Sequence, residues 1–224
     1  MNTDINFSLA PILKGTDTDT KRVLYFGDPM CSWCWGFAPQ FSRIVQHVQE
    51  RAEVHLFMGG LRTDAVTAWD QNLRNYVRQH WQNVAQRTHQ PFHFSRFDDD
   101  QFIYNTEPAC RALITVRGIN PLATLQMFET LQHAFYATGQ NITKTNVLRD
   151  CAQSCNIDVD LFDEHFKTSH VTDVTQTEFS FAPQFGVSGF PTVILIDQGH
   201  TQVLTTGFQK FENLSTTLEQ WLIA

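Results

Sequence analysis

The sequence has little charge of either sign: Asp, Glu, Lys and Arg make up 17% of its 224 residues, and its net charge is −7. No cluster of Lys or Arg interrupts this acidic balance, which argues against a surface for nucleic acid or for an anionic membrane. No apolar run approaches the roughly 18 residues that a membrane-spanning helix needs. We therefore expect a protein that binds neither nucleic acid nor membrane.

The beginning of the chain lacks a targeting feature, because residues 1–7 have neither the basic nor the apolar stretch of a secretory signal. The cysteine count of five is odd, whereas secreted disulfide frameworks more often contain an even number. Both observations predict a cytoplasmic protein. The hydrophobic content of 42% is that of an ordinary globular chain with a sizeable core.

The most informative stretch is Cys31-Ser32-Trp33-Cys34, which follows an apolar run over 23–26 and opens a helical pattern. A helix N-terminus offers unpaired N–H groups and a partial positive charge, so it stabilises a thiolate over a thiol. Cys34, one turn later, is close enough to attack Cys31 when that residue is held in a mixed disulfide. The stretch therefore predicts thiol–disulfide exchange.

The pattern along the chain predicts an α/β protein. Strands over 23–26 and 53–58 flank an amphipathic helix that starts at residue 32 and contains Pro39, which should bend or break it. The middle of the chain is helical, beginning with apolar residues at helical spacing over 66–81. Strands over 192–196 and 201–205 form a predicted hairpin before a closing helix over 211–222. The predicted order is β-α-β, helical insert, β-β-α.

Two motifs in this order resemble the thioredoxin-fold oxidoreductases. The first is the cysteine stretch with Pro39 five residues beyond Cys34, and the second is Gly189-Phe190-Pro191-Thr192 before a strand. The helical insert resembles that of DsbA-like members. Asp28-Pro29-Met30 before the cysteines resembles the cytosolic, FrnE-like branch, whose members are often described as predicted protein disulfide isomerases. The resemblance implies a thioredoxin-fold domain over 1–60 and 183–224 and an α-helical insert domain over 61–182.

The resemblance also implies roles for particular residues. Cys31 is the expected nucleophile and the more exposed sulfur, and Cys34 is the expected resolving thiol. Pro191 is expected to be cis and to face both cysteines, so that the backbone of Phe190 can pair with an extended substrate. Phe190, Trp33 and Ser32 are the expected substrate-binding residues. The chemistry requires no bound cofactor and no metal.

The implied partners are a protein or peptide that contains a disulfide and a reductant such as glutathione or a thioredoxin-like protein. Ser32 and Trp33 stand where the periplasmic oxidant of the family has a histidine between its cysteines. Without that histidine we expect a less oxidising disulfide, which favours reduction or isomerisation. Two alternatives stay open: a glutathione-dependent transferase or isomerase of the kappa and hydroxychromene-carboxylate type, whose members carry serine at the position of Cys31, and a chaperone-like binding module with a vestigial redox pair.

Four further residues could carry chemistry. Asp28 could accept a proton near Cys34, although an Asp before a Pro more often forms a turn. Cys151 and Cys155 share one helix face, where they could be buried apolar residues, a second redox pair or metal ligands. A Cys₄ zinc site with the first pair would contradict the proline motif. Cys110 or a histidine could join Cys151 and Cys155 as a metal ligand, and Cys110 has no other assigned role.

Overall fold

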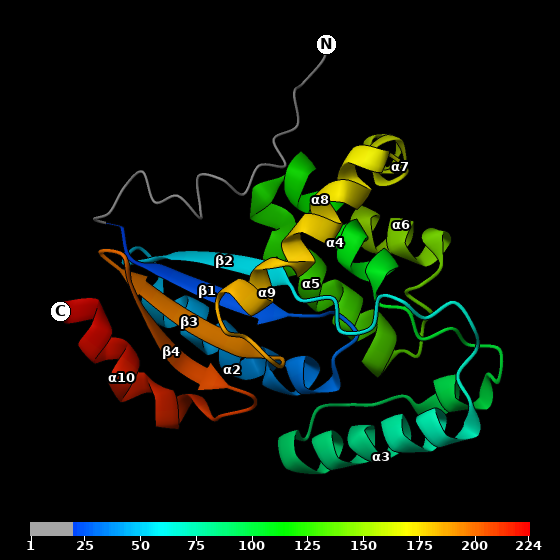
Figure 1. Cartoon of the computed structure of the whole chain (residues 1–224), viewed down its shortest axis with the longest axis horizontal. Coiled ribbons are helices and arrows are strands. Elements are labelled where there is room, and N and C mark those ends of the chain that lie inside the picture. The colour runs from blue at the N-terminus through cyan, green and yellow to red at the C-terminus, as the bar shows by residue number, and fades with distance from the viewer. Residues whose placement is uncertain (1–19) are drawn as a thin grey trace.

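A computed structural model describes residues 20–224, and a four-stranded sheet lies at its centre (Figure 1). The strands are β1 (Arg22–Gly27), β2 (Glu53–Met58), β3 (Thr192–Asp197) and β4 (His200–Thr206), in the order β2-β1-β3-β4. β1 pairs with β2 in parallel and with β3 antiparallel, and β3 and β4 form the predicted antiparallel hairpin. The predicted fold class is confirmed. Residues 1–7, on which the cytoplasmic prediction partly rests, lie outside the described residues.

The central strand β1 is buried on both faces, as its unbroken apolar run predicts. Val23 and Tyr25 pack on the side of α2 (Ser32–Val48) and α10 (Phe211–Ile223). Leu24 and Phe26 pack on the opposite side, against residues of the short helix α9 (Phe181–Gln184) and its neighbours. Helix α2 runs without interruption through Pro39, where we predicted a bend or a break.

The stretch between β2 and β3 is helical, as predicted. It contains α3 (Gln71–Thr88), α4 (Glu107–Ile119), α5 (Thr124–Gln132), α6 (Thr145–Ser154), α7 (Val159–Phe166), α8 (Ser169–Phe179), two 3₁₀ turns (Phe94–Asp98 and Pro121–Ala123) and a π turn (His133–Ala137). One cluster of buried side chains joins these helices to α2 and the sheet. The division into two domains stays a prediction.

The prediction of a helix from residue 66 is wrong, because α3 begins only at Gln71. Asp70 caps it by accepting a hydrogen bond from the Leu73 backbone N–H. Val66 is exposed, and Trp69 packs from the preceding loop against the rings of Phe97, Phe102 and Tyr104. The spacing of Trp69 therefore reflects contacts with distant aromatic residues and not a helical turn.

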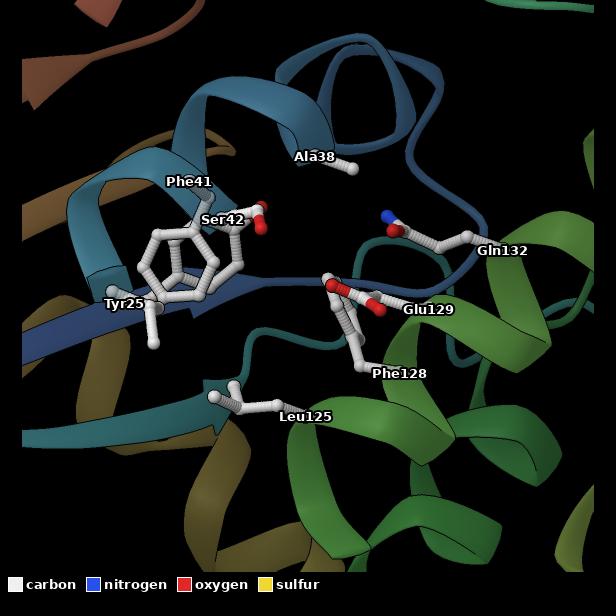
Figure 2. A pocket seen from close by; sticks show the side chains of 9 residues that line it. Tyr25, Ala38, Phe41, Ser42, Leu125, Phe128, Glu129 and Gln132 are labelled. Carbon is white, nitrogen blue, oxygen red and sulfur yellow. The ribbon is translucent and has the colours of Figure 1, made fainter. Parts of the chain in front are cut away.

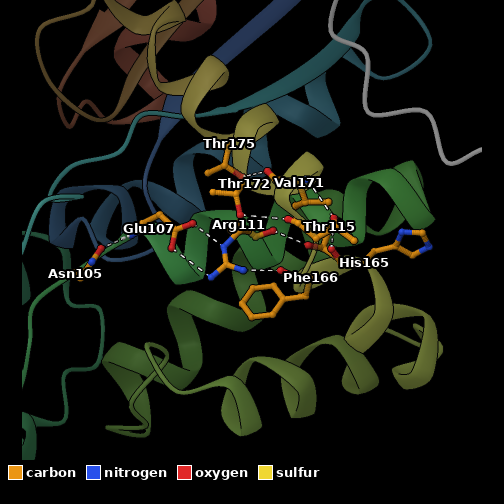
Figure 3. A network of polar contacts seen from close by, with 10 residues as sticks. Asn105, Glu107, Arg111, Thr115, His165, Phe166, Val171, Thr172 and Thr175 are labelled. Atoms are coloured by element: carbon orange, nitrogen blue, oxygen red, sulfur yellow. Dashed lines mark hydrogen bonds and ion pairs between the residues drawn. The ribbon is translucent and has the colours of Figure 1, made fainter. Parts of the chain in front are cut away.

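Polar contacts around Arg111 hold the helices of the insert together (Figure 3). Its Nε lies 2.6 Å from Glu107 Oε1 on the same helix, and Nη1 donates to the carbonyl oxygen of Phe166 at the end of α7. The guanidinium also lies 4.1 Å from the centre of the Phe166 ring. Because the planar guanidinium satisfies several acceptors at once, it fixes α4 against α7.

A second ion pair joins the insert to the sheet. Arg117 of α4 pairs with Glu178 of α8, whose side chain is fully buried. Arg117 Nη1 also donates to the Leu56 carbonyl oxygen at 2.9 Å, and Glu178 Oε1 accepts from the Met58 backbone N–H at 2.6 Å. The Leu56 carbonyl and the Met58 N–H both lie on the outer edge of β2, which is an edge strand of the sheet. The Arg117–Glu178 ion pair therefore satisfies backbone groups that have no neighbouring strand.

Among the helices of residues 20–224, none is both long and apolar enough to cross a lipid bilayer.

Candidate active site

The turn after β1 positions the cysteines through Asp28. This carboxylate is fully buried: Oδ1 accepts from the Met30 backbone N–H and Oδ2 from the Leu61 backbone N–H, both at 2.8 Å. The Asp28 carbonyl oxygen accepts from the Cys31 backbone N–H at 3.0 Å. These bonds close the turn so that Cys31 becomes the N-cap of α2 and Cys34 lies in its first turn.

Asp28 therefore acts as the turn former that we considered for it. Its Oδ2 also accepts a hydrogen bond of 3.5 Å from the Cys110 thiol on α4. Burial raises the pKa of Asp28, although the backbone bonds to Leu61 and Met30 act in the opposite direction. Burial, and next the charge of Asp28, raise the pKa of the Cys110 thiol. Cys110 is thus a protonated donor to the turn.

The two cysteines differ in exposure in the predicted order. Cys31 is 5% exposed, whereas Cys34 is fully buried. Cys31 Sγ lies 3.6 Å from the carbonyl oxygen of Phe190 and donates to it. Burial raises the pKa of Cys34, and the neighbouring Cys31 raises it further. Cys31 is thus the more accessible sulfur, and Cys34 is a buried thiol with a raised pKa.

The segment before β3 faces these cysteines, as the resemblance implies. The peptide bond between Phe190 and Pro191 is cis, and the Pro191 carbonyl oxygen accepts from the Gly207 backbone N–H at 2.7 Å. The Phe190 ring packs directly over Gly59, where an added Cβ would lie 1.9 Å from the ring. Only glycine at residue 59 permits this position of the ring, so the end of β2 helps to place Phe190.

A cleft of about 260 Å³ opens beside Cys31. Three of its lining residues are the predicted substrate-binding ones: Ser32, Trp33 and Phe190. The remaining wall comes from the loop after β2, from α3 and from the loop before α4, namely Leu61, Arg62, Leu73, Tyr76, Val77, His80, Trp81 and Tyr104. The cleft is therefore mostly apolar. Among residues 20–224, its lining includes the permanent cation of Arg62 and no carboxylate.

Helix α3 forms one wall of the cleft because it packs closely on α2. An added Cβ at Gly36 would lie 2.7 Å from Val84 and 2.9 Å from Thr88, so a larger residue would push the helices apart. In the segment after α3, the Pro91 carbonyl oxygen accepts a 3.0 Å hydrogen bond from Trp35 Nε1, which fixes this segment against α2. Trp35 therefore has a packing role, whereas Trp33 is part of the cleft wall.

Sequence reasoning missed Arg62, Tyr76 and His80 as residues of the site. None of them belongs to a motif. The signals that could have found them are the Gly59-Gly60 pair two residues before Arg62 and the one-turn spacing of Tyr76 and His80 on α3. Their position in the cleft depends on how α3 packs, which the sequence alone does not reveal.

The remaining cysteines lie apart from the cleft. Cys151 is on α6 and Cys155 ends that helix, and both are buried among apolar residues. All five cysteines are free thiols. Within residues 20–224, no three His, Cys, Asp or Glu side chains converge as metal ligands would.

Residues 22–219 match the family of DsbA-like thioredoxin domains. The chain belongs to this family. The DsbA-like match covers both cysteine and proline motifs and all of the helical insert between them. The match confirms the resemblance on which the predicted fold was based. The DsbA-like family consists of disulfide oxidoreductases, so the chain belongs to a family of such enzymes.

Solved structures of the DsbA-like fold are similar over nearly the whole chain. A "putative protein disulfide isomerase" from Nitrosomonas europaea is 32% identical, with a TM-score of 0.84 over 92% of this chain and 98% of that one. The cytosolic disulfide reductase DsbM from Pseudomonas aeruginosa is 26% identical, with a TM-score of 0.71 over 90% of this chain and 95% of that one. Another structure of DsbM contains GSH.

Curated relatives of this DsbA-like chain are more distant. The ClpXP adapter protein SpxH of Bacillus subtilis is 21% identical over 80% of this chain and 59% of its own length. The chain spans about three fifths of the length of the first two curated relatives that it matches.

Proposed function

We propose that the protein is a cytoplasmic thiol–disulfide oxidoreductase that reduces or isomerises disulfides through Cys31 and Cys34. The observation that carries this proposal is the position of Cys31. Its sulfur lies at the N-terminus of α2, 3.6 Å from the Phe190 carbonyl oxygen and at the wall of a cleft. A thiol there is reachable by a second sulfur, and it lies beside the unpaired N–H groups of the helix N-terminus.

The exchange proceeds in two displacements. The Cys31 thiolate attacks one sulfur of a substrate disulfide, forms a mixed disulfide and releases the other sulfur as a thiolate that takes up a proton. Cys34 then loses its proton and attacks the Cys31 sulfur, which releases the second substrate thiolate. The substrate gains two electrons, and the enzyme is left with a Cys31–Cys34 disulfide. Pro191 borders the exchanging sulfurs without offering a competing N–H donor.

Reduction is the direction that Ser32 and Trp33 favour, because no histidine lies between the cysteines to stabilise the thiolate form. We predict a reduction potential nearer to thioredoxin, about −270 mV, than to the strongly oxidising periplasmic enzyme, about −120 mV. Equilibration in glutathione buffers of known potential, followed by alkylation of the free thiols, measures it. A value at the oxidising end contradicts the proposed direction, and a cysteine pair that never exchanges with the buffer contradicts the function itself.

Glutathione is the reductant that the cleft fits best. Arg62 is exposed, and within residues 20–224 its guanidinium forms no ion pair; it lies 6.0 Å from the Tyr104 ring. A tripeptide thiol carries carboxylates that an unpaired guanidinium can bind, and its backbone can lie along the apolar wall of Leu73 and Tyr76. The GSH in a structure of DsbM supports this choice of reductant. Two molecules of glutathione would return the Cys31–Cys34 disulfide to the dithiol and leave as oxidised glutathione.

Replacing Arg62 with glutamine is expected to raise the KM for glutathione about tenfold, because the variant loses one charge-assisted hydrogen bond to a carboxylate. Steady-state assays with a small disulfide at varied glutathione concentrations measure this change. Arg74→Gln is the matched control, since Arg74 lies on α3, is partly buried and does not line the cleft. Equal KM values for the two variants would exclude Arg62 from reductant binding.

A further inference from the structure

The cleft beside Cys31 contains two basic side chains from separate elements. Arg62 lies on the loop after β2, and His80 lies on α3, where the centre of its ring is 4.4 Å from that of Tyr76. Within residues 20–224, neither basic side chain forms an ion pair, and no Asp or Glu lines the cleft. The whole chain has a net charge of −7. The cleft is therefore a locally basic site on an acidic protein, and it favours an anionic ligand.

Two other hollows do not combine a reactive sulfur with basic groups. A cavity of about 50 Å³ lies between β1, α2 and α5 (Figure 2), where Glu129 and Gln132 project from α5 toward Ala38. It has room for no more than a few water molecules. A groove of about 390 Å³ on the insert contains Lys144 but also Asp99, and no cysteine among the described residues lines it. Neither hollow can bring an anionic ligand to the exchanging sulfur.

A glutathionyl group matches the charge of the cleft. It carries two carboxylates, one at each end of the tripeptide, and its cysteine lies between them. A carboxylate accepts charge-assisted hydrogen bonds from a guanidinium, and an imidazole offers an N–H donor in either protonation state. Arg62 and His80 can therefore bind the two carboxylates, while Leu73 and Phe190 border the chain between them. A protein cysteine has no carboxylate at a fixed place beside it, so an ordinary protein disulfide lacks these two contacts.

The buried position of Cys34 leaves a glutathionyl group on Cys31 open to attack by a thiol from solution. Cys31 lines the cleft, whereas Cys34 is fully buried and does not line it. Burial also raises the pKa of Cys34, so little of its thiolate is present near neutral pH. A glutathione thiolate that reaches the cleft can therefore compete with Cys34 for the mixed disulfide.

We propose that the protein removes glutathione from S-glutathionylated proteins through Cys31 alone, with Arg62 and His80 binding the carboxylates of the glutathionyl group. This inference rests on the proposed function, which supplies Cys31 as the nucleophile and glutathione as the reductant. It adds a substrate class, the mixed disulfide of a protein with glutathione, and a route that bypasses Cys34.

The reaction consists of two exchanges at the Cys31 sulfur. The Cys31 thiolate attacks the glutathione sulfur of the substrate, the substrate S–S bond breaks, and the protein leaves as a thiolate. A glutathione thiolate from solution then attacks the glutathione sulfur on Cys31, which releases oxidised glutathione and restores the Cys31 thiolate. Overall, the protein thiol is reduced and the incoming glutathione is oxidised, and the proton of the incoming glutathione is taken up by the protein thiolate.

Two mixed disulfides of one cysteine peptide test the proposal, one with glutathione and one with 2-mercaptoethanol, which has no carboxylate. Chromatography measures the release of peptide thiol from each in the presence of glutathione. We expect the wild type to prefer the glutathione mixed disulfide about a hundredfold in kcat/KM, since each of two charge-assisted hydrogen bonds contributes about tenfold. Arg62→Gln and His80→Phe should each lower this preference about tenfold. His80→Phe keeps an aromatic ring against Tyr76 and removes the N–H groups.

The matched controls are Arg74→Gln and His200→Phe, which make similar exchanges outside the cleft. His200 lies on β4, at the end of the β3–β4 hairpin away from Pro191. Both controls should keep the wild-type preference for the glutathione mixed disulfide.

Cys34→Ser separates the two routes. It should still release peptide thiol from the glutathione mixed disulfide, whereas its rate of insulin reduction should fall at least about tenfold, because it lacks the thiol that resolves a protein mixed disulfide. Cys34→Ala replaces this variant if the serine variant does not fold. Cys31→Ala should lose both activities.

Three results would overturn the inference: equal rates for the two mixed disulfides in the wild type, a preference that stays the same in Arg62→Gln and His80→Phe, or loss of peptide release in the folded Cys34 variant. A wild-type protein that reduces insulin but does not react with the glutathione mixed disulfide overturns the inference and leaves the proposed function intact. A wild-type protein that reacts with neither contradicts the proposed function, so the two failures are distinguishable.

Discussion

Replacing Cys31 with alanine is expected to abolish disulfide exchange, with the rate of insulin reduction falling at least about a thousandfold. No other sulfur in the described chain lies beside the Phe190 carbonyl oxygen at the cleft. Removing a nucleophile on which every later step depends leaves no partial route, as losses of this size in other covalent catalysts show. Turbidity of insulin in the presence of glutathione, and refolding of scrambled ribonuclease, measure the loss.

The matched control for this prediction is Cys151→Ala. It removes one buried sulfur from α6, away from the cleft, and should leave the rate of insulin reduction unchanged. If the Cys31 variant retains activity, the protein is not a Cys31-dependent enzyme. A variant that loses exchange but still suppresses aggregation of unfolded insulin would identify a binding module, which is the alternative that the sequence leaves open.

Replacing Glu178 with alanine is expected to lower the free energy of unfolding by about 3–5 kcal/mol, the usual cost of breaking a buried ion pair from one side. The change leaves the Arg117 guanidinium without its carboxylate and the Met58 backbone N–H without its acceptor. Because native domains are stable by only about 5–15 kcal/mol, the loss is a large fraction of the total. Urea unfolding monitored by circular dichroism measures it.

Glu178→Gln supplies a milder variant, since its amide oxygen can still accept from Met58 while the charge is lost. It should unfold between the wild type and the alanine variant. Glu212→Ala is the surface control: Glu212 pairs with Arg43, and both side chains are largely exposed, so no measurable change is expected. If the Glu178 and Glu212 variants unfold alike, the ion pair does not hold the insert to β2.

The proximity of Cys31 and Phe190 could be predicted because the sheet brings two motifs together. Phe26 of β1 pairs with Thr192 of β3, so the turn after one strand lies beside the segment before the other. Cys31 and Phe190 are 159 residues apart in the chain, yet this register places them in contact. Short motifs at the ends of strands that are predicted to be neighbours can thus be predicted to lie close together.

The cleft could not be predicted in the same way. Arg62 belongs to a loop, and Tyr76 and His80 belong to a helix whose side chains could equally have faced solvent. Their orientation depends on the close contact at Gly36, which lets α3 lie against α2. Periodicity also placed the start of α3 too early, because Trp69 has helical spacing but packs against Phe97 and Phe102.

Helix α3 has a consequence for how this protein can change over generations. Cys31 and Cys34 belong to the strand–turn–helix unit around the cysteine turn, whereas much of the wall of the cleft belongs to α3. Selection on Tyr76 or His80 can therefore alter which molecules enter without altering the redox couple. The same separation offers engineers a single exchangeable helix with which to change the molecules that the cleft accepts.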